Sequence, residues 1–249
     1  MIWQACNGNN HITCISGTLY RLVESQEQVA TMGYVDTLAE QALLEEMLEQ
    51  TKPNYPSDID AYHYLLTTPF RYPPLEYGSR FGRTSEPSLF YAGCDQSVTL
   101  AESAFYRFVF FDSIEGATET DKMRSEHTMF SIDYQTDLGV RLQHPPFNQF
   151  QAELSHLTDY SQTQQLGSDM REAGVLGFEY DSARDANNGI CVALYNTSPF
   201  LGESPTNNEQ WLCETSMSKV LFKATDESTI YQFPIDNFLV NDALPIPAC

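Results

Sequence analysis

The order of hydrophobic and polar positions along the chain predicts both helices and strands. Apolar residues recur at helical spacing over 37–50, where Thr37 and Glu40 form a capping-box pair, and this predicts a helix. Asp95 is placed to cap a second helix that runs to about residue 110, and residues 161–173 form a third that ends at Gly174. Short apolar or alternating runs predict strands at 15–23, 89–92, 129–134, 175–180, 189–195 and 218–224.

Two segments between these elements are predicted to be irregular. Pro69, Pro73 and Pro74 lack the backbone N–H, so residues 69–74 are expected to be extended and outside any helix or central strand. Residues 78–83 contain two glycines and are expected to be flexible. The mixed order of helices and strands predicts an α+β fold with antiparallel pairing. Since no repeat or low-complexity linker divides the chain, residues 1–249 are expected to form a single domain.

The charge of the chain limits its partners. A formal net charge of -21 excludes a nucleic-acid-binding surface over the whole protein and argues against binding to anionic membranes. It is compatible with a basic protein partner, and an anionic small molecule would need a local group of positive charges. The six cysteines are scattered and the N-terminus has no secretory pattern, so we expect free thiols in a cytoplasmic protein.

Several common kinds of site are not indicated. The chain has no glycine-rich dinucleotide motif, no P-loop, no serine nucleophile elbow and no zinc-protease motif. The histidines show no zinc-ligand spacing, so no metal is expected and each is interpreted as a surface or core residue: His11, His63, His127, His144 and His156.

Three arginines lie within thirteen residues of a chain that has only 13 basic residues in total: Arg71, Arg80 and Arg83. Their guanidinium groups can bind phosphate oxygens in a bidentate way, and the nearby glycines would let a ligand approach the backbone. The alternative is that these arginines pair at the surface with the abundant Asp and Glu.

Four further residues fall at positions where they could act on a ligand. Tyr91 follows Arg80 by eleven residues and Glu102 follows Tyr91 by eleven. Alone, Tyr91 fits a core aromatic and Glu102 fits a solvated helix face. Ser161 is either a helix N-cap or a ligand for phosphate or ribose oxygens at that helix start, and Ser182 is either a turn residue or such a ligand.

The ordered set of these segments resembles the RES domain, a family named after an Arg, a Glu and a Ser. The resemblance covers residues 17–196 and rests on Leu19–Arg21, Gly78–Phe81, Phe90–Ala92, Leu100–Glu102, 161–167 and Tyr180–Arg184. Residues 24–70 are then an insertion that contains the first predicted helix, and Ser79 and Phe81 replace the usual Gly and Trp. The first family arginine is Arg21 or Arg71, with Arg21 favoured by the Leu-Tyr-Arg pattern, and the serine is Ser161 or Ser182.

The resemblance implies a fold like that of ADP-ribosyltransferases and cleavage of the nicotinamide–ribose bond of NAD, with water or phosphate as acceptor. By carry-over, Glu102 is the catalytic carboxylate and Tyr91 packs against the nicotinamide or its ribose. Arg21 and Arg80 hold phosphates, Arg71 and Arg83 are further phosphate ligands, and Ser161 or Ser182 positions ribose or phosphate oxygens.

NAD is then a substrate, with inorganic phosphate a possible second one, and no cofactor is required. The resemblance also implies a protein antitoxin as partner, and a homodimer is compatible with it. Two rival functions remain open: transfer of ADP-ribose to a protein, and a non-catalytic module that senses NAD or docks a partner.

Overall fold

The computed structural model describes residues 1–25, 35–54, 61–116, 118 and 120–245. These residues form a mixed α+β domain, which confirms the predicted fold class. An eight-stranded sheet is accompanied by α-helices, with short 3₁₀ turns between elements. The α-helices are α1 (Ile2–Ala5), α2 (Leu38–Thr51), α3 (Tyr64–Arg71), α4 (Gln96–Asp112), α5 (Gln151–Leu154) and α6 (Ser161–Glu172).

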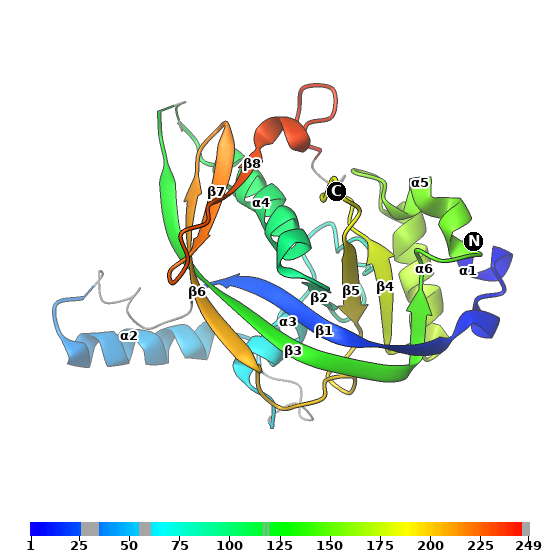
Figure 1. The fold of residues 1–249 in the computed structure, drawn as a ribbon. Helices are drawn as coiled ribbons and strands as arrows, with labels where there is room; N and C mark the ends of the chain where they lie inside the picture. The colour runs from blue at the N-terminus through cyan, green and yellow to red at the C-terminus, as the bar shows by residue number, and fades with distance from the viewer. Residues whose placement is uncertain (26–34, 55–60, 117, 119, 246–249) are drawn as a thin grey trace.

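The sheet has the strand order β1-β2-β5-β4-β3-β6-β7-β8 (Figure 1). Only β3 and β4 pair in parallel, and the other neighbours are antiparallel. Because β1 also pairs with β3 along most of its length, β1, β2, β5, β4 and β3 form a closed ring of pairings. The strands are β1 (Thr13–Glu24), β2 (Phe90–Gly93), β3 (Met123–Arg141), β4 (Gly177–Asp181), β5 (Ile190–Leu194), β6 (Asn207–Thr215), β7 (Lys219–Ala224) and β8 (Tyr231–Pro234).

Local sequence patterns correctly predicted the helix starts. The Thr37 hydroxyl accepts the Glu40 backbone N–H at 3.2 Å, and Glu40 accepts the Thr37 N–H at 3.0 Å, so the capping box of α2 is complete. Asp95 accepts the Val98 N–H at 2.9 Å and caps α4. The residue after α6 that adopts positive φ is Gly174, at +79°. These contacts are local, which is why sequence alone could find them.

The predictions for 69–74 and for the strands need correction. Pro69 lies inside α3, which is stabilised by the burial of Leu65, Leu66 and Thr67. Because α3 ends two residues after Pro69, the missing N–H disturbs only its last turn. The strand predicted at 129–134 is part of the 19-residue β3, and β6 and β8 were not predicted. β6 is mostly polar and β8 has only four residues, so tertiary pairing defines both strands.

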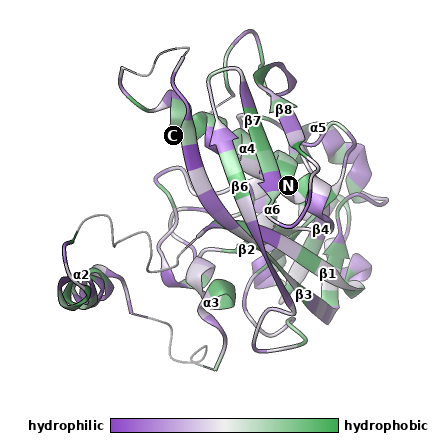
Figure 2. Cartoon of the chain, turned by 60° about the vertical axis from the view of Figure 1, so that its left-hand side comes forward, coloured by the Kyte–Doolittle hydropathy of each residue, from purple (hydrophilic) through white to green (hydrophobic). Residues whose placement is uncertain are grey.

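Helix α2 stands apart from the rest of the described chain (Figures 1 and 2). The sequence placed Leu44, Met47 and Leu48 on one apolar face, but Met47 and Leu48 are exposed and only Gln41 is buried. This helix lies in the part of the chain that the sequence interpreted as an insertion. Its capping box and the ion pair between Glu49 and Arg71 of α3 stabilise it, with little core packing.

The two faces of the sheet carry different cores. Neighbouring residues of a strand point to opposite faces. Phe90 of β2 joins Leu19 and Leu65 in the cluster on the α3 side, whereas Tyr91 packs against the cluster that contains Phe178. The hydrophobic cluster that a side chain packs against shows on which face of the sheet it lies. Only predicted site residues on the same face can contact one another.

Candidate active site

Glu102 of α4 meets two residues from the ends of β4 and β5. The Ser182 hydroxyl donates to Glu102 Oε1 at 2.5 Å, and the Cys191 thiol lies 4.0 Å from the same oxygen. Glu102 is half-buried, and its other oxygen, Oε2, accepts no hydrogen bond from the described residues. The helix thus presents a carboxylate with one oxygen fixed and the other available for a ligand.

Ser182 is held in place by the turn that follows β4. Its oxygen accepts the backbone N–H groups of Arg184 and Asp185, each at 3.0 Å, and its side chain is buried. With two N–H groups donating to it, the hydroxyl has its own proton free to donate to Glu102. The turn-residue interpretation of Ser182 is therefore correct locally, and the same turn orients Glu102.

A second carboxylate in the fold, Glu179 of β4, has a different environment. It is buried and accepts hydrogen bonds from Tyr134 at 3.1 Å, Arg141 at 3.1 Å and Gln143 at 3.0 Å. Its oxygens are used for internal bonds, so Glu179 fits a structural role. Glu102 is the carboxylate with a free oxygen.

Arg80 is anchored by backbone carbonyl groups. Its Nη1 donates to the carbonyl oxygens of Leu154 at 3.2 Å and His156 at 2.7 Å, and its guanidinium carbon lies 4.6 Å from the centre of the Tyr160 ring. No described carboxylate forms an ion pair with Arg80. Although the protein is acidic, the Arg80 guanidinium is not paired with a described Asp or Glu, so it is available to bind an anionic ligand.

Tyr91 fixes the backbone on both sides of Arg80. Its hydroxyl lies 2.9 Å from the Ser79 hydroxyl and accepts the Phe81 N–H at 3.2 Å. Burial raises the pKa of Tyr91 to about 12. Its ring packs edge-on against Tyr180, at 6.5 Å between centroids. Tyr91 is therefore in place to position Arg80 as well as to contact a ligand.

Helix α6 holds the 78–83 segment from the other side. Gln164 Nε2 donates to the carbonyl oxygens of Tyr77 and Ser79, both at 3.0 Å. A Cβ on Gly167 would lie 1.8 Å from the Phe81 carbonyl oxygen, so only glycine permits this approach. The prediction that residues 78–83 are flexible is therefore wrong, since two elements fix the segment.

Two tyrosines show that Glu102 and Arg80 belong to one cluster. The buried Tyr180 phenol is close enough to interact electrostatically with Glu102, Tyr91 and Arg80, and burial raises its pKa well above the usual value. Tyr106 lies one helical turn after Glu102 on α4, is 53% exposed, and its hydroxyl interacts with Glu102 and Arg80. Spacing of i and i+4 from Glu102 could have indicated Tyr106 from the sequence.

Arg83 and Ser161 line a pocket next to this cluster, with a volume of about 510 Å³. Ser161 is the first residue of α6 and not its cap, because Tyr160 occupies the cap position and the Ser161 N–H is bound by Asp159 at 2.9 Å. Arg83 donates to Gln165. Tyr160 lines the same pocket and packs on Arg80, so the pocket and the Glu102 cluster are adjacent.

Arg21 lies on the other face of the sheet. Its guanidinium carbon is 4.9 Å from the centre of the Phe90 ring, and Phe90 belongs to the core on the α3 side. Within the described part of the chain, its Nη1 donates to the Tyr91 carbonyl oxygen at 3.4 Å. Burial lowers the pKa of Arg21 to about 10. The structure therefore does not bring Arg21 together with Glu102 and Arg80.

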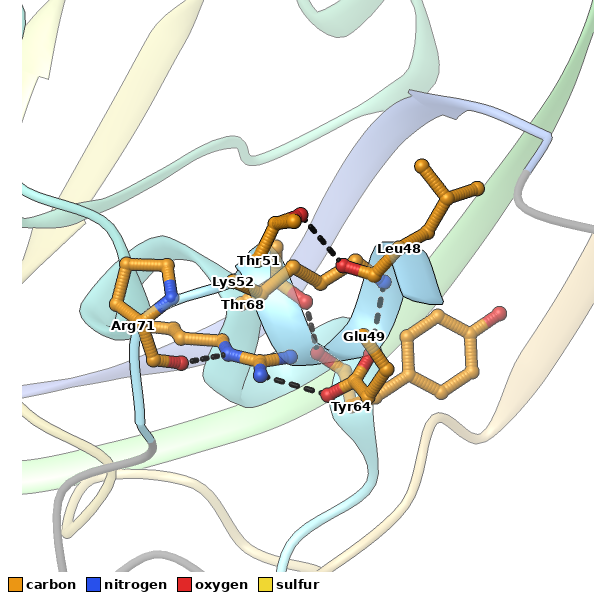
Figure 3. Close-up of polar contacts among 8 residues, drawn as sticks. Leu48, Glu49, Thr51, Lys52, Tyr64, Thr68 and Arg71 are labelled. Carbon is orange, nitrogen blue, oxygen red and sulfur yellow. Dashed lines mark hydrogen bonds and ion pairs between the residues drawn. The ribbon is translucent and has the colours of Figure 1, made fainter. Parts of the chain in front are cut away.

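Arg71 ends α3 and joins it to α2 (Figure 3). Its Nη2 lies 2.6 Å from Glu49 Oε1, and its Nε donates to the Pro53 carbonyl oxygen at 2.5 Å. Lys52 also pairs with Glu49, at 2.9 Å. The surface ion-pair interpretation fits these contacts of Arg71, which are made away from Glu102.

Comparison with protein-family models supplies the family. The RES domain model matches residues 56–216, which is more than half of the chain. The chain belongs to the RES-domain family. No curated protein matched the chain. The RES match contains Arg71, Arg80, Tyr91, Glu102, Ser161 and Ser182, and it begins after Arg21.

Membership of the RES family supports an NAD-related, toxin-like role at the level of the family. Three further findings concern the described residues. They contain no group of three or more metal-ligating side chains, and no helix among them is long and apolar enough to cross a membrane. The five cysteines in the described ranges are free thiols.

Proposed function

We propose that this RES protein cleaves the nicotinamide–ribose bond of NAD, with Glu102 as the catalytic carboxylate and water or phosphate as acceptor. The observation that carries the proposal is the Glu102 carboxylate, fixed by Ser182 at 2.5 Å, with the buried Tyr180 near enough to interact electrostatically with both Glu102 and Arg80. Family membership supports the same substrate.

The chemistry needs little more than this arrangement. As nicotinamide leaves, positive charge develops on the ribose, and a fixed carboxylate stabilises it electrostatically. Ser182 holds Oε1, so Oε2 is the oxygen that would face the ribose. Nicotinamide departs as a neutral ring, so no strong general acid is required. Enclosure by the tyrosines orients the acceptor.

The neighbouring residues supply binding. Arg80 would hold phosphate oxygens, and Tyr91 would position Arg80 and contact the nicotinamide end. The pocket of about 510 Å³ with Arg83 and Ser161 would take another part of the dinucleotide. Arg21, which contacts the Tyr91 carbonyl oxygen and the Phe90 ring, and Arg71, which pairs with Glu49, are given no ligand in this scheme.

Nicotinamide release by purified protein, with and without phosphate, tests the activity. We expect release from the wild type and at least a thousandfold loss of kcat in Glu102→Gln, because the electrostatic stabilisation is removed. Glu227→Gln, which changes an exposed carboxylate, is the control and should behave as wild type. Full activity in a folded Glu102→Gln protein would overturn the assignment.

The same assay with labelled NAD decides the acceptor and the rival function. Label in free ADP-ribose indicates hydrolysis, label in a phosphorylated product indicates phosphorolysis, and label on protein indicates ADP-ribosyl transfer. We further propose that a protein antitoxin neutralises the activity in the cytoplasm. The family supports such a partner, and the net charge of -21 favours a basic docking surface on it.

A further inference from the structure

Arg184 is a buried arginine with an unused donor. It follows β4 by three residues, is 7% exposed, and is anchored by one hydrogen bond from Nη2 to the Leu157 carbonyl oxygen at 3.0 Å. Its guanidinium carbon lies 3.5 Å from the centre of the Phe105 ring. Its Nη1 is buried and has no hydrogen-bond partner among the described residues. Such a donor is costly to bury unless a ligand uses it.

Among the described residues, no carboxylate lies at ion-pair distance from Arg184, although Glu102 is near enough to interact with it electrostatically. Within the described ranges, no ion pair involves Arg184 or Arg80, although the chain has 34 acidic residues and 13 basic ones. Arg184 and Arg80 are near enough to interact with each other, and burial lowers the pKa of Arg184. Two like charges in a partly buried site repel each other unless an anion lies between or beside them.

The same short segment anchors both arginines. Arg80 donates to the carbonyl oxygens of Leu154 and His156, and Arg184 donates to that of Leu157. Aromatic rings orient both guanidinium planes, Tyr160 for Arg80 and Phe105 for Arg184. The two forks are therefore held in a fixed relation by neutral groups, which leaves their charge for a ligand.

We propose that Arg184 and Arg80 together form a site for phosphate oxygens beside Glu102. A phosphate group offers enough acceptor oxygens to bind both guanidinium groups at once. The assignment rests on the proposed function in one respect: in NAD a single ribose separates the diphosphate from the bond that Glu102 would act on. The Tyr106 phenol is near enough to interact electrostatically with both arginines and with Glu102.

Binding of inorganic pyrophosphate, measured by calorimetry, tests the proposal without any cleavage. We expect the wild type to bind it and Arg184→Gln to bind it at least tenfold more weakly. The matched control is Arg171→Gln. Arg171 also lies on an aromatic ring, Tyr195 at 4.5 Å, and donates to a backbone carbonyl, but it is outside the cluster. Absence of binding to the wild type, or unchanged binding in Arg184→Gln, overturns the proposal.

Arg184 is buried, so Arg184→Gln could fail to fold. Arg184→Lys, which keeps the charge but loses the fork, and Arg80→Gln then decide. Each should weaken binding at least fivefold, and unchanged affinity in both folded variants overturns the site.

The bound phosphate could belong to the diphosphate of the dinucleotide or to free inorganic phosphate, and a competition experiment distinguishes the two. If ADP-ribose displaces inorganic phosphate, the site takes the diphosphate of the dinucleotide. If both bind at once and Arg184→Lys weakens only phosphate, the site takes the free acceptor. A protein that binds pyrophosphate through Arg184 but releases no nicotinamide would retain this site and refute the proposed function. A protein that cleaves NAD, but whose binding of pyrophosphate and ADP-ribose does not depend on Arg184, would retain the proposed function and refute this site.

Discussion

At the scale of single residues, a hydrogen bond joins Glu102 to Ser182, one of the two candidates for the family serine. The sequence left Ser161 and Ser182 as alternatives for one role. The structure gives them different surroundings: Ser182 contacts the carboxylate, and Ser161 lines the pocket at the start of α6. In the proposed mechanism, Ser182 would position Glu102 and not contact the substrate, and this role has a kinetic consequence.

Ser182→Ala should lower kcat for NAD about 10- to 100-fold with little change in KM, because Glu102 loses its orientation while the binding groups remain. The two N–H groups that Ser182 accepts would lose their partner, so the free energy of unfolding should also fall by about 1–3 kcal/mol. Steady-state kinetics and urea unfolding measure both effects.

Ser113→Ala is the control for that variant, since Ser113 bonds only the last turn of α4. It should retain wild-type kinetics. A raised KM with unchanged kcat in Ser182→Ala would instead indicate that the hydroxyl binds substrate directly.

At the scale of elements, the site depends on how α6 packs against the 78–83 segment. Gly167 permits the contact, and Gln164 bonds two carbonyl groups of that segment. The Tyr195 hydroxyl donates to the Gly167 carbonyl oxygen at 2.7 Å, which ties the same point of α6 to the end of the sheet. Arg80 is thus positioned by a helix that comes some eighty residues later in the chain.

Gly167→Ala should destabilise the fold by about 1–3 kcal/mol, because the new Cβ would overlap the Phe81 carbonyl and force the helix and segment apart. Since Phe81 adjoins Arg80, KM for NAD should rise as well. Thermal unfolding and kinetics test this.

Gly202→Ala provides the comparison for Gly167→Ala. At Gly202 a Cβ would meet only the Ser204 carbonyl oxygen at 3.7 Å, so stability should change by less than about 0.5 kcal/mol. Equal stability of the two variants would contradict the proposed close packing of α6.

At the scale of the whole molecule, a long β3 connects the two halves of the sheet, and a histidine is buried within it. His127 is 4% exposed, its Nε2 lies 2.9 Å from the Ser125 hydroxyl, and Arg107 is close. Burial, followed by the charge of Arg107, lowers the pKa of His127 to about 4. The imidazole is therefore neutral in the folded protein at neutral pH.

This shift makes stability depend on pH in a defined direction. The unfolded chain takes up a proton at His127 below about pH 6.5, whereas the folded protein does so only near its lower pKa. The stabilisation is therefore complete above pH 6.5 and is lost as pH falls toward 4. Between about pH 7 and about pH 5, the free energy of unfolding should fall by about 2 kcal/mol because of His127.

Urea unfolding at these two pH values measures the loss. In His127→Gln, the fall in unfolding free energy between the two pH values should be smaller than in the wild type by about 2 kcal/mol. The variant itself should be less stable than the wild type at both pH values. An equal pH dependence in the two proteins would show that His127 is protonated in the folded state or does not contribute.

By itself, the sequence determined the features that depend on neighbours in the chain. These features are the caps at Thr37 and Asp95, the six predicted strands that recur in the sheet, and the spacing of Arg80, Tyr91 and Glu102. All are set within a few turns or residues. The ordered motifs were also enough to identify the RES family, which the family model then confirmed.

Only the tertiary structure decided which of the predicted residues meet. Strand register and face place Arg21 with Phe90 and away from Glu102, and a helix–helix ion pair holds Arg71. The turn after β4 brings Ser182 and Arg184, eighty or more residues from Glu102, to the same cluster. Pairing between distant strands and burial of charge depend on contacts across the whole fold, and local spacing contains no information about them.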